Sequence, residues 1–148
     1  MADARNVLPD PEPGQDELVD ALVENAFMTM AALTRIGAEH DMSLTQLRVL
    51  GILRDRRVRI TVLADFLGLD KSTMTGLVGR AEKRGLLQRA PNPDDGRAVD
   101  VFVTEAGAAL IDRARAQVDR ELAPRIDELT PAEQRRLQSL LQRMRPAH

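Results

Sequence analysis

Apolar residues recur every three or four positions along the first part of the chain, which is the spacing of one face of an α-helix. The pattern extends from Asp16 to about Asp41 and is carried by Val19, Leu22, Ala26, Met30, Leu33 and Ile36. At 1.5 Å per residue this predicted helix spans roughly 35–40 Å, about the width of a small domain. A helix of that length extends beyond its own core, so we expect it to pack against a partner.

A second helix is predicted directly after Ser43. Ser43 and Gln46 have the spacing of a capping box, in which each side chain binds the backbone N–H of the other residue. The helix carries the apolar residues Leu47, Leu50, Ile52 and Leu53 and ends in a cationic run, which consists of Arg54, Arg56, Arg57 and Arg59. We interpret this run as a solvated helix end, with contact to phosphate groups as the alternative.

The segment from Asp70 to Gly85 predicts a helix with two unlike faces. Asp70 can cap its first turn, and Gly85 can adopt the left-handed conformation that ends a helix. One face is apolar and consists of Met74, Leu77, Val78 and Ala81. The other is small, hydroxylic and cationic, and consists of Lys71, Ser72, Thr73, Thr75, Gly76, Gly79 and Arg80. Such a face suits the DNA major groove, where small side chains allow close approach and hydroxyls bind phosphates and base edges.

A shorter helix is predicted just before this segment. Thr61 is expected to cap a helix over Val62–Leu67, and Gly68 provides a tight turn into the next helix. Two helices joined in this way, the second with a polar outer face, form the helix-turn-helix pattern.

A β-hairpin is predicted after the second helix of this pair. Residues 86–89 and 99–103 have the composition of strands, and residues 91–97 between them are dense in turn formers. The two-stranded hairpin would be a wing with Arg97 at its tip. An arginine held there can enter the narrow, electronegative minor groove.

The end of the chain predicts two further helices. Thr104 is expected to cap a helix that Pro124 kinks or breaks, because proline cannot donate the intrahelical hydrogen bond. The last helix begins at Thr130–Glu133, another capping box, and carries an apolar stripe of Leu137, Leu140, Leu141 and Met144. Three terminal helices thus carry apolar stripes outside the winged core, and a two-fold dimer would bury them.

We therefore expect a mainly α, winged helix-turn-helix protein with six helices and a two-stranded wing. Residues 1–15 are rich in proline and acids and are expected to be a flexible arm. Residues 16–42 and 105–148 are the predicted dimerisation helices, and residues 43–104 are the predicted winged lobe.

Charge is divided unevenly along the chain. The net charge is −2, but the winged lobe holds eleven Lys and Arg against seven Asp and Glu, whereas residues 1–42 hold two against nine. Positive charge is therefore concentrated where a phosphate-facing surface would need it. With three Phe and neither Tyr nor Trp, the chain is poorly suited to stack on single-stranded bases.

Composition also excludes several classes of chemistry. The chain has no cysteine and two histidines, so we expect no thiol chemistry, no metal and no cofactor. No Ser/His/Asp arrangement or phosphate-binding glycine loop indicates an enzyme. No apolar run is long enough to span a membrane and no signal peptide is evident, so we expect a cytoplasmic protein.

The order of elements and four sequence pieces resemble the MarR family of transcription regulators. The pieces lie at residues 44–50, 63–75, 82–87 and 95–107. The resemblance implies a homodimer that binds a pseudo-palindromic operator in double-stranded DNA, with its recognition helices about 34–36 Å apart. It also implies that Arg97 enters the minor groove while Asp95 supports nearby arginines. Gly76 and Gly79 depart from the longer side chains of many members, which favours fewer direct base contacts.

Members of this family often bind small anionic aromatic molecules between the dimer helices and the winged lobe. The resemblance therefore predicts an effector that releases a repressor from DNA. Residues near that position here are Met30, His40, Met42 and Arg48. The alternatives for them are a core methionine, a helix-end histidine and a structural ion pair. The alternative function is a non-sensing winged-helix module that coats DNA or contacts protein.

Overall fold

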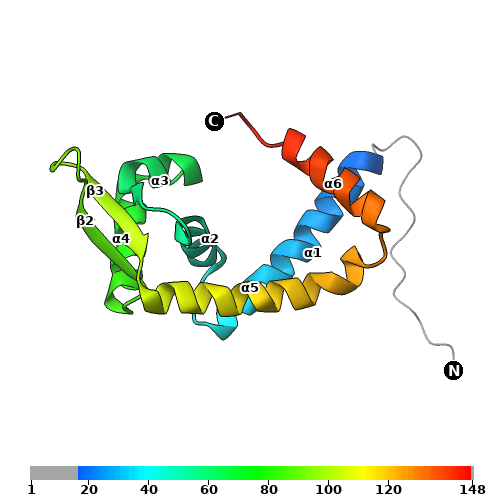
Figure 1. Ribbon diagram of the computed structural model, residues 1–148, viewed down its shortest axis with the longest axis horizontal. Coiled ribbons are helices and arrows are strands. Elements are labelled where there is room, and N and C mark those ends of the chain that lie inside the picture. The colour runs from blue at the N-terminus through cyan, green and yellow to red at the C-terminus, as the bar shows by residue number, and fades with distance from the viewer. Residues whose placement is uncertain (1–16, 148) are drawn as a thin grey trace, which may run out of the picture.

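The computed structural model describes residues 17–147, so the predicted arm at residues 1–15 lies outside the described residues. Within that range the chain forms six helices and one small antiparallel sheet (Figure 1). In chain order the elements are α1 (Glu17–Glu39), α2 (Leu44–Leu53), β1 (Val58–Arg59), α3 (Ile60–Leu67), α4 (Lys71–Lys83), β2 (Leu87–Pro91), β3 (Val99–Val103), α5 (Glu105–Ile126) and α6 (Pro131–Arg143). The mainly helical winged fold predicted from the sequence is confirmed.

The molecule is elongated. The winged lobe lies at one end, and α6 and the first turns of α1 lie toward the other (Figure 1). α5 connects the two ends and packs on α1, α2 and β3. The orientation of the winged lobe relative to α1 and α6 therefore depends on how α5 begins.

One apolar core holds the winged lobe together. Its largest fully buried side chains are Val49, Leu50, Leu53, Leu63, Met74, Val78, Leu87 and Val101. They come from α2, α3, α4 and the sheet, so every element of the lobe contributes to the same core. The predicted apolar face of α4 is buried in it, which turns the polar face outward.

The sheet has the strand order β1-β3-β2. The predicted hairpin pairs β2 with β3 in antiparallel register, with Leu87 opposite Val103. A third strand, β1, pairs on the other edge of β3, with Val58 opposite Val101. Sequence analysis missed β1 because two residues are too few to show an alternating pattern.

Two local predictions need correction: Thr61 does not cap α3, and Pro124 does not break α5, which was one of the two effects expected of it. α3 begins at Ile60 with Arg59 at the N-cap and without a side-chain cap, so Thr61 lies inside the helix rather than capping it. The reason is that β1 leads directly into α3, and its pairing with β3 sets the chain path there. α5 continues past Pro124 to Ile126, and the N–H of Asp127 still bonds the carbonyl of Ala123 at 2.8 Å. Proline removes only its own hydrogen bond, and that single loss does not end the helix here.

Candidate nucleic-acid interface

α4 is capped at both ends as the sequence predicts. The Asp70 carboxylate accepts hydrogen bonds from the N–H of Thr73 at 2.7 Å and from the hydroxyl of Ser72 at 2.9 Å. These bonds, above all the one from the Thr73 backbone, hold the pKa of Asp70 below its usual value. At the other end Gly85 has a φ of 74°, the left-handed conformation that favours glycine.

The polar residues predicted on α4 share one outer surface. The side chains of Lys71, Ser72, Thr73, Thr75 and Arg80 are exposed, and Gly76 and Gly79 are half-buried between them. The acid within α4, Glu82, is paired with Arg89 of β2 through two contacts of 3.1 and 3.2 Å. The exposed charges that α4 presents are therefore the cations Lys71, Arg80 and Lys83.

Arg84 fixes the C-terminal end of α4 to the end of α1. Its guanidinium donates to the carbonyl of Asp41 at 2.9 Å and to that of His40 at 2.8 Å. A cation at the C-terminal end of a helix also interacts favourably with the partial negative charge there. The orientation of α4 is thus tied to α1 as well as to the core.

The wing carries its arginine at the tip. The Arg97 side chain is 99% exposed, and its Nε lies 3.9 Å from Asp95 Oδ1. Asp95 Oδ1 accepts a hydrogen bond from the Arg97 backbone at 3.1 Å, and Asn92 Oδ1 accepts from the backbones of Asp94 and Asp95. Side chains thus order the backbone of the tip while the Arg97 guanidinium projects into solvent.

A polar network that the sequence pattern did not predict lies at the base of the wing. The Asp100 side chain is only 5% exposed and accepts a hydrogen bond from Arg57 Nε at 2.7 Å. Asn92 Nδ2 also donates to this carboxylate at 3.0 Å. The bond from Asn92 and the charges of Arg57 and Arg59 hold the pKa of Asp100 below its usual value, despite burial.

The cationic run after α2 is divided by these contacts. Arg54 pairs with Asp112 of α5 at 2.7 and 3.0 Å, and Arg57 pairs with Asp100. Arg56 and Arg59 are exposed. The solvated helix end expected from the sequence therefore describes only part of the run, because two of its members hold neighbouring elements.

The four predicted ligand residues do not converge on one pocket. Met42 is buried in the core, whereas Met30 is 44% exposed on α1. The Arg48 guanidinium lies 5.6 Å from the ring centre of Phe66 instead of forming the ion pair considered above. His40 faces α5, where its Nε2 lies 2.5 Å from Gln117 Oε1.

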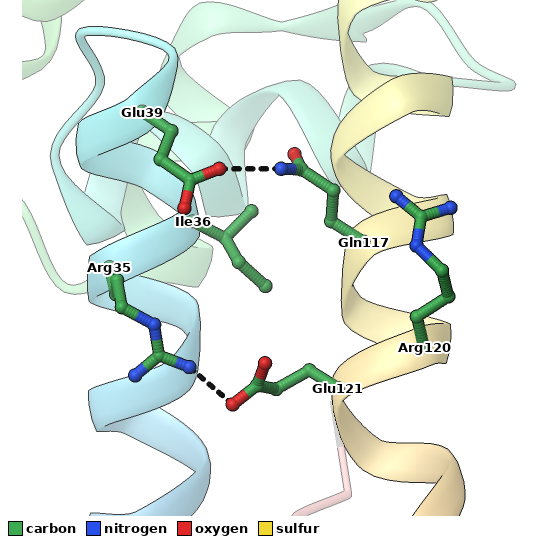
Figure 2. A pocket seen from close by; sticks show the side chains of 6 residues that line it. All are labelled: Arg35, Ile36, Glu39, Gln117, Arg120 and Glu121. Atoms are coloured by element: carbon green, nitrogen blue, oxygen red, sulfur yellow. Dashed lines mark hydrogen bonds and ion pairs between the residues drawn. The ribbon is translucent and has the colours of Figure 1, made fainter.

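Two neighbouring hollows between α1 and α5 were not predicted. The first is lined by Arg35, Ile36, Glu39, Gln117, Arg120 and Glu121, and Figure 2 shows the side chains from the two helices facing one another. Arg35 pairs with Glu121 across it, and Gln117 donates to Glu39 at 2.6 Å. The second has a volume of about 300 Å³ and is lined by His40, Arg113, Ala116, Gln117 and Arg120. We call this second space the His40 hollow.

The described residues offer no metal site or membrane span. No group of three or more His, Cys, Asp or Glu side chains within residues 17–147 is arranged to hold a metal ion. None of the helices in that range is both long and apolar enough to cross a membrane.

Two helices joined by a tight turn and followed by a β-hairpin define the chain as a winged helix-turn-helix protein. A family model described as MarR family matches residues 40–98. The chain is 31% identical over 108 residues to the multiple antibiotic resistance protein MarR of Escherichia coli, covering 72% of this chain and 75% of that protein. The chain therefore belongs to the MarR family of transcriptional regulators.

Two further similarities agree with this assignment. The transcriptional repressor IacR of Pseudomonas putida is 34% identical over 112 residues, which cover 74% of this chain and 66% of IacR. A structure of a MarR mutant from Escherichia coli complexed with operator DNA superposes with a TM-score of 0.69 at 26% identity. That match covers 88% of this chain and 95% of the other.

The low pKa of Asp100 predicts a pH-dependent contribution to stability. A carboxyl group whose pKa is lower in the folded than in the unfolded chain stabilises the fold above the unfolded value, about 3.9 for aspartate. This contribution is lost as the pH falls through the lower folded pKa. We expect the difference in unfolding free energy between the parent and Asp100→Asn proteins to be constant above about pH 5 and to shrink below pH 4.

Urea unfolding followed by circular dichroism at fixed protein concentration measures this difference. The other acids with lowered pKa values, Asp70, Glu82, Asp112 and Glu133, are present in both proteins and cancel. A difference that stays the same down to pH 2.5 would contradict the role given to Asp100.

Proposed function

We propose that this protein is a homodimeric, sequence-specific DNA-binding repressor that a small anionic effector releases from its operator. α4 enters the major groove with Lys71, Ser72, Thr73, Thr75, Gly76 and Arg80, and Arg97 enters the adjacent minor groove. A MarR structure of the same fold is complexed with operator DNA, which supports DNA binding by this chain. Residues 43–104 form the DNA-binding lobe, and residues 16–42 and 105–148 form the dimerisation part.

The two glycines of α4 carry this proposal. A Cβ at Gly79 would meet nothing within 4 Å, and a Cβ at Gly76 would meet only the end of the Arg80 side chain at 3.4 Å. Packing within the described residues therefore does not require glycine at either position, although each costs a helix about 1 kcal/mol relative to alanine. The two glycines leave the helix surface between Lys71 and Arg80 without protruding side chains. Such a surface allows another backbone to approach closely, as in a DNA groove.

Removing either α4 cation should weaken binding to all DNA sequences. We expect Lys71→Ala and Arg80→Ala each to lower the slope of log K against log salt by about one unit, because each lost phosphate contact releases one counterion fewer. The probe is a duplex selected from a random-sequence library, titrated beside a random duplex at several salt concentrations. Arg115→Ala is the control, since it removes one exposed positive charge from α5, where Arg115 pairs with Asp119.

Unchanged salt slopes in both α4 variants would remove Lys71 and Arg80 from the interface. Equal affinity for the selected and random duplexes would favour the architectural module over the sequence-specific repressor, because specific binding is typically at least ~10³-fold tighter than non-specific binding.

Dimerisation is supported by apolar surface on the terminal helices. None of the described α6 residues is buried, yet α6 carries Leu137, Leu140 and Leu141 and is followed by Met144 at its C-cap, and all four are exposed. Leu22, Val23 and Phe27 of α1 are exposed as well. Large apolar side chains gathered on exposed helices mark an interaction site, and a two-fold axis would bury two copies of them at once.

A charge on α6 should dissociate the dimer. We expect the parent protein to sediment with twice the chain mass of 16.4 kDa and Leu141→Asp to sediment as a monomer at micromolar concentration. Val62→Asp is the matched control, because Val62 is similarly exposed but lies on α3 in the winged lobe. Circular dichroism checks that both variants stay folded. A dimeric Leu141→Asp protein, or a monomeric parent, would be inconsistent with this part of the proposal.

The effector part of the proposal rests on the His40 hollow. Arg113 and Arg120 give it positive charge, and its volume of about 300 Å³ is at the lower end of small-molecule sites. The hollow adjoins His40, whose carbonyl accepts a hydrogen bond from Arg84 at the end of α4. An anionic aromatic ligand bound here would contact the same turn that orients α4.

Salicylate and related phenolic acids probe this site. We expect a ligand to raise the melting temperature of the parent protein, since binding only to the folded state adds about 2.7 kcal/mol at 100 times Kd, and to weaken operator binding. Arg120→Ala should abolish both effects, whereas Arg48→Ala should leave them intact because Arg48 lies against Phe66. If no phenolic acid changes either quantity, effector response fails for this class.

A further inference from the structure

Asp100 is the one charged residue within 17–147 that is buried. It lies on the central strand β3, three positions after Arg97. Burying a carboxylate is costly unless it is paired and hydrogen-bonded. The residues that donate hydrogen bonds to the Asp100 carboxylate therefore identify the most constrained polar contacts of the wing.

The first partner, Arg57, lies in the chain before α3 and contacts both strands of the wing. Its Nε donates to Asp100 Oδ2 at 2.7 Å, and its Nη2 donates to the carbonyl of Pro91, the last residue of β2, at 2.8 Å. Its guanidinium also lies 5.0 Å from the ring centre of Phe102 on β3. One planar group thus links the chain before α3 to both strands of the wing.

The second partner, Asn92, continues these contacts to the tip. Its Nδ2 donates to both Asp100 oxygens, at 3.0 and 3.2 Å. Its Oδ1 accepts from the backbone N–H groups of Asp94 and Asp95, at 2.9 and 3.1 Å. Asp95 in turn accepts from the N–H of Arg97 at 3.1 Å. Hydrogen bonds therefore run without a gap from Arg57 to the backbone of Arg97.

We propose that Arg57 and Asp100 are positioning residues for minor-groove recognition, which act by fixing the wing tip so that Arg97 meets the DNA already oriented. This inference rests on the proposed insertion of Arg97 in the minor groove. The physical basis is that a loop ordered before binding loses less conformational freedom on association than a mobile one. Arg57 would therefore raise affinity without itself contacting DNA.

Arg57→Lys is the informative variant. It keeps the positive charge, and with it the attraction to phosphates, but a lysine cannot reproduce the planar contacts to Asp100 and Pro91 at once. We expect it to weaken binding to the selected duplex about tenfold, within the range measured for members of one network. The salt slope should stay at the parent value because no phosphate contact is lost.

A double-mutant cycle with Arg97→Ala tests the mechanism. Arg57→Lys should cost about tenfold in the parent background and almost nothing when Arg97 is already absent. Arg54→Lys is the matched control from the same cationic run, because Arg54 pairs with Asp112 of α5 and not with the wing. It should show no coupling to Arg97. Hydrogen exchange at the Asp94, Asp95 and Arg97 amides should accelerate in Arg57→Lys, and circular dichroism checks that the variant stays folded.

The outcomes separate the two proposals. If Arg97→Ala binds the duplex as well as the parent does, the minor-groove part of the proposed function fails. If Arg97→Ala weakens binding but Arg57→Lys does not, or costs the same with and without Arg97, the positioning role is overturned and the network is a stabilising feature alone.

Discussion

The close approach of α5 to the corner between α4 and β2 is the contact on which the arrangement of the molecule depends. A Cβ at Gly107 would lie 2.1 Å from the carbonyl oxygen of Leu86, so only glycine allows the first turn of α5 to lie against this backbone. The same carbonyl accepts a hydrogen bond from the N–H of Thr104 at 3.0 Å. The Thr104 hydroxyl, which also caps α5, donates to the carbonyl of Gly85 at 2.6 Å. The end of α4 and the start of α5 are therefore one rigid joint.

This joint determines where α4 lies relative to the far end of α5. α5 extends from the joint along the molecule to the turn before α6 (Figure 1). In a two-fold dimer built on α1 and α6, the separation of the two α4 helices then follows from the joint and the length of α5. A DNA-binding dimer needs that separation fixed, because half-sites on one face of the duplex are about 34–36 Å apart. Apolar packing holds α4 in the lobe, whereas the joint would give it a defined distance from its copy in the proposed dimer.

Local features of this fold could be predicted from the sequence, because caps and helix faces depend on residues a few positions apart. The capping boxes at Ser43 and Thr130 and the cap at Asp70 all form as expected. The network of Arg57, Asn92 and Asp100 could not be predicted, since Arg57 and Asp100 are 43 positions apart and meet only once β1 pairs with β3. An aspartate between the apolar residues of a predicted strand was the one available signal.

The predicted ligand residues illustrate the same limit. They were chosen by their places along α1 and α2, but the hollows between α1 and α5 are closed by residues of α5 such as Gln117 and Arg120. The apolar residues Leu110, Ile111 and Ala114 turn one face of α5 inward, but its contacts with α1 arise only from the tertiary packing of the two helices. Only His40 among the predicted set lines the hollow that we propose as the ligand site.

The turn after α1 connects the His40 hollow to α4 through the hydrogen bonds that Arg84 donates to its backbone. The carbonyl of Gly37 accepts from the N–H groups of both His40 and Met42, and Asp41 has a φ of 55°, which is uncommon for a residue with a side chain. A Cβ at Gly37 would lie 2.8 Å from the carbonyl oxygen of Met42, so the turn is tight as well as strained. The carbonyls of His40 and Asp41 are held by the single guanidinium of Arg84. In the proposed effector response, a displacement of His40 toward or away from α5 would therefore reach the end of α4 through Arg84.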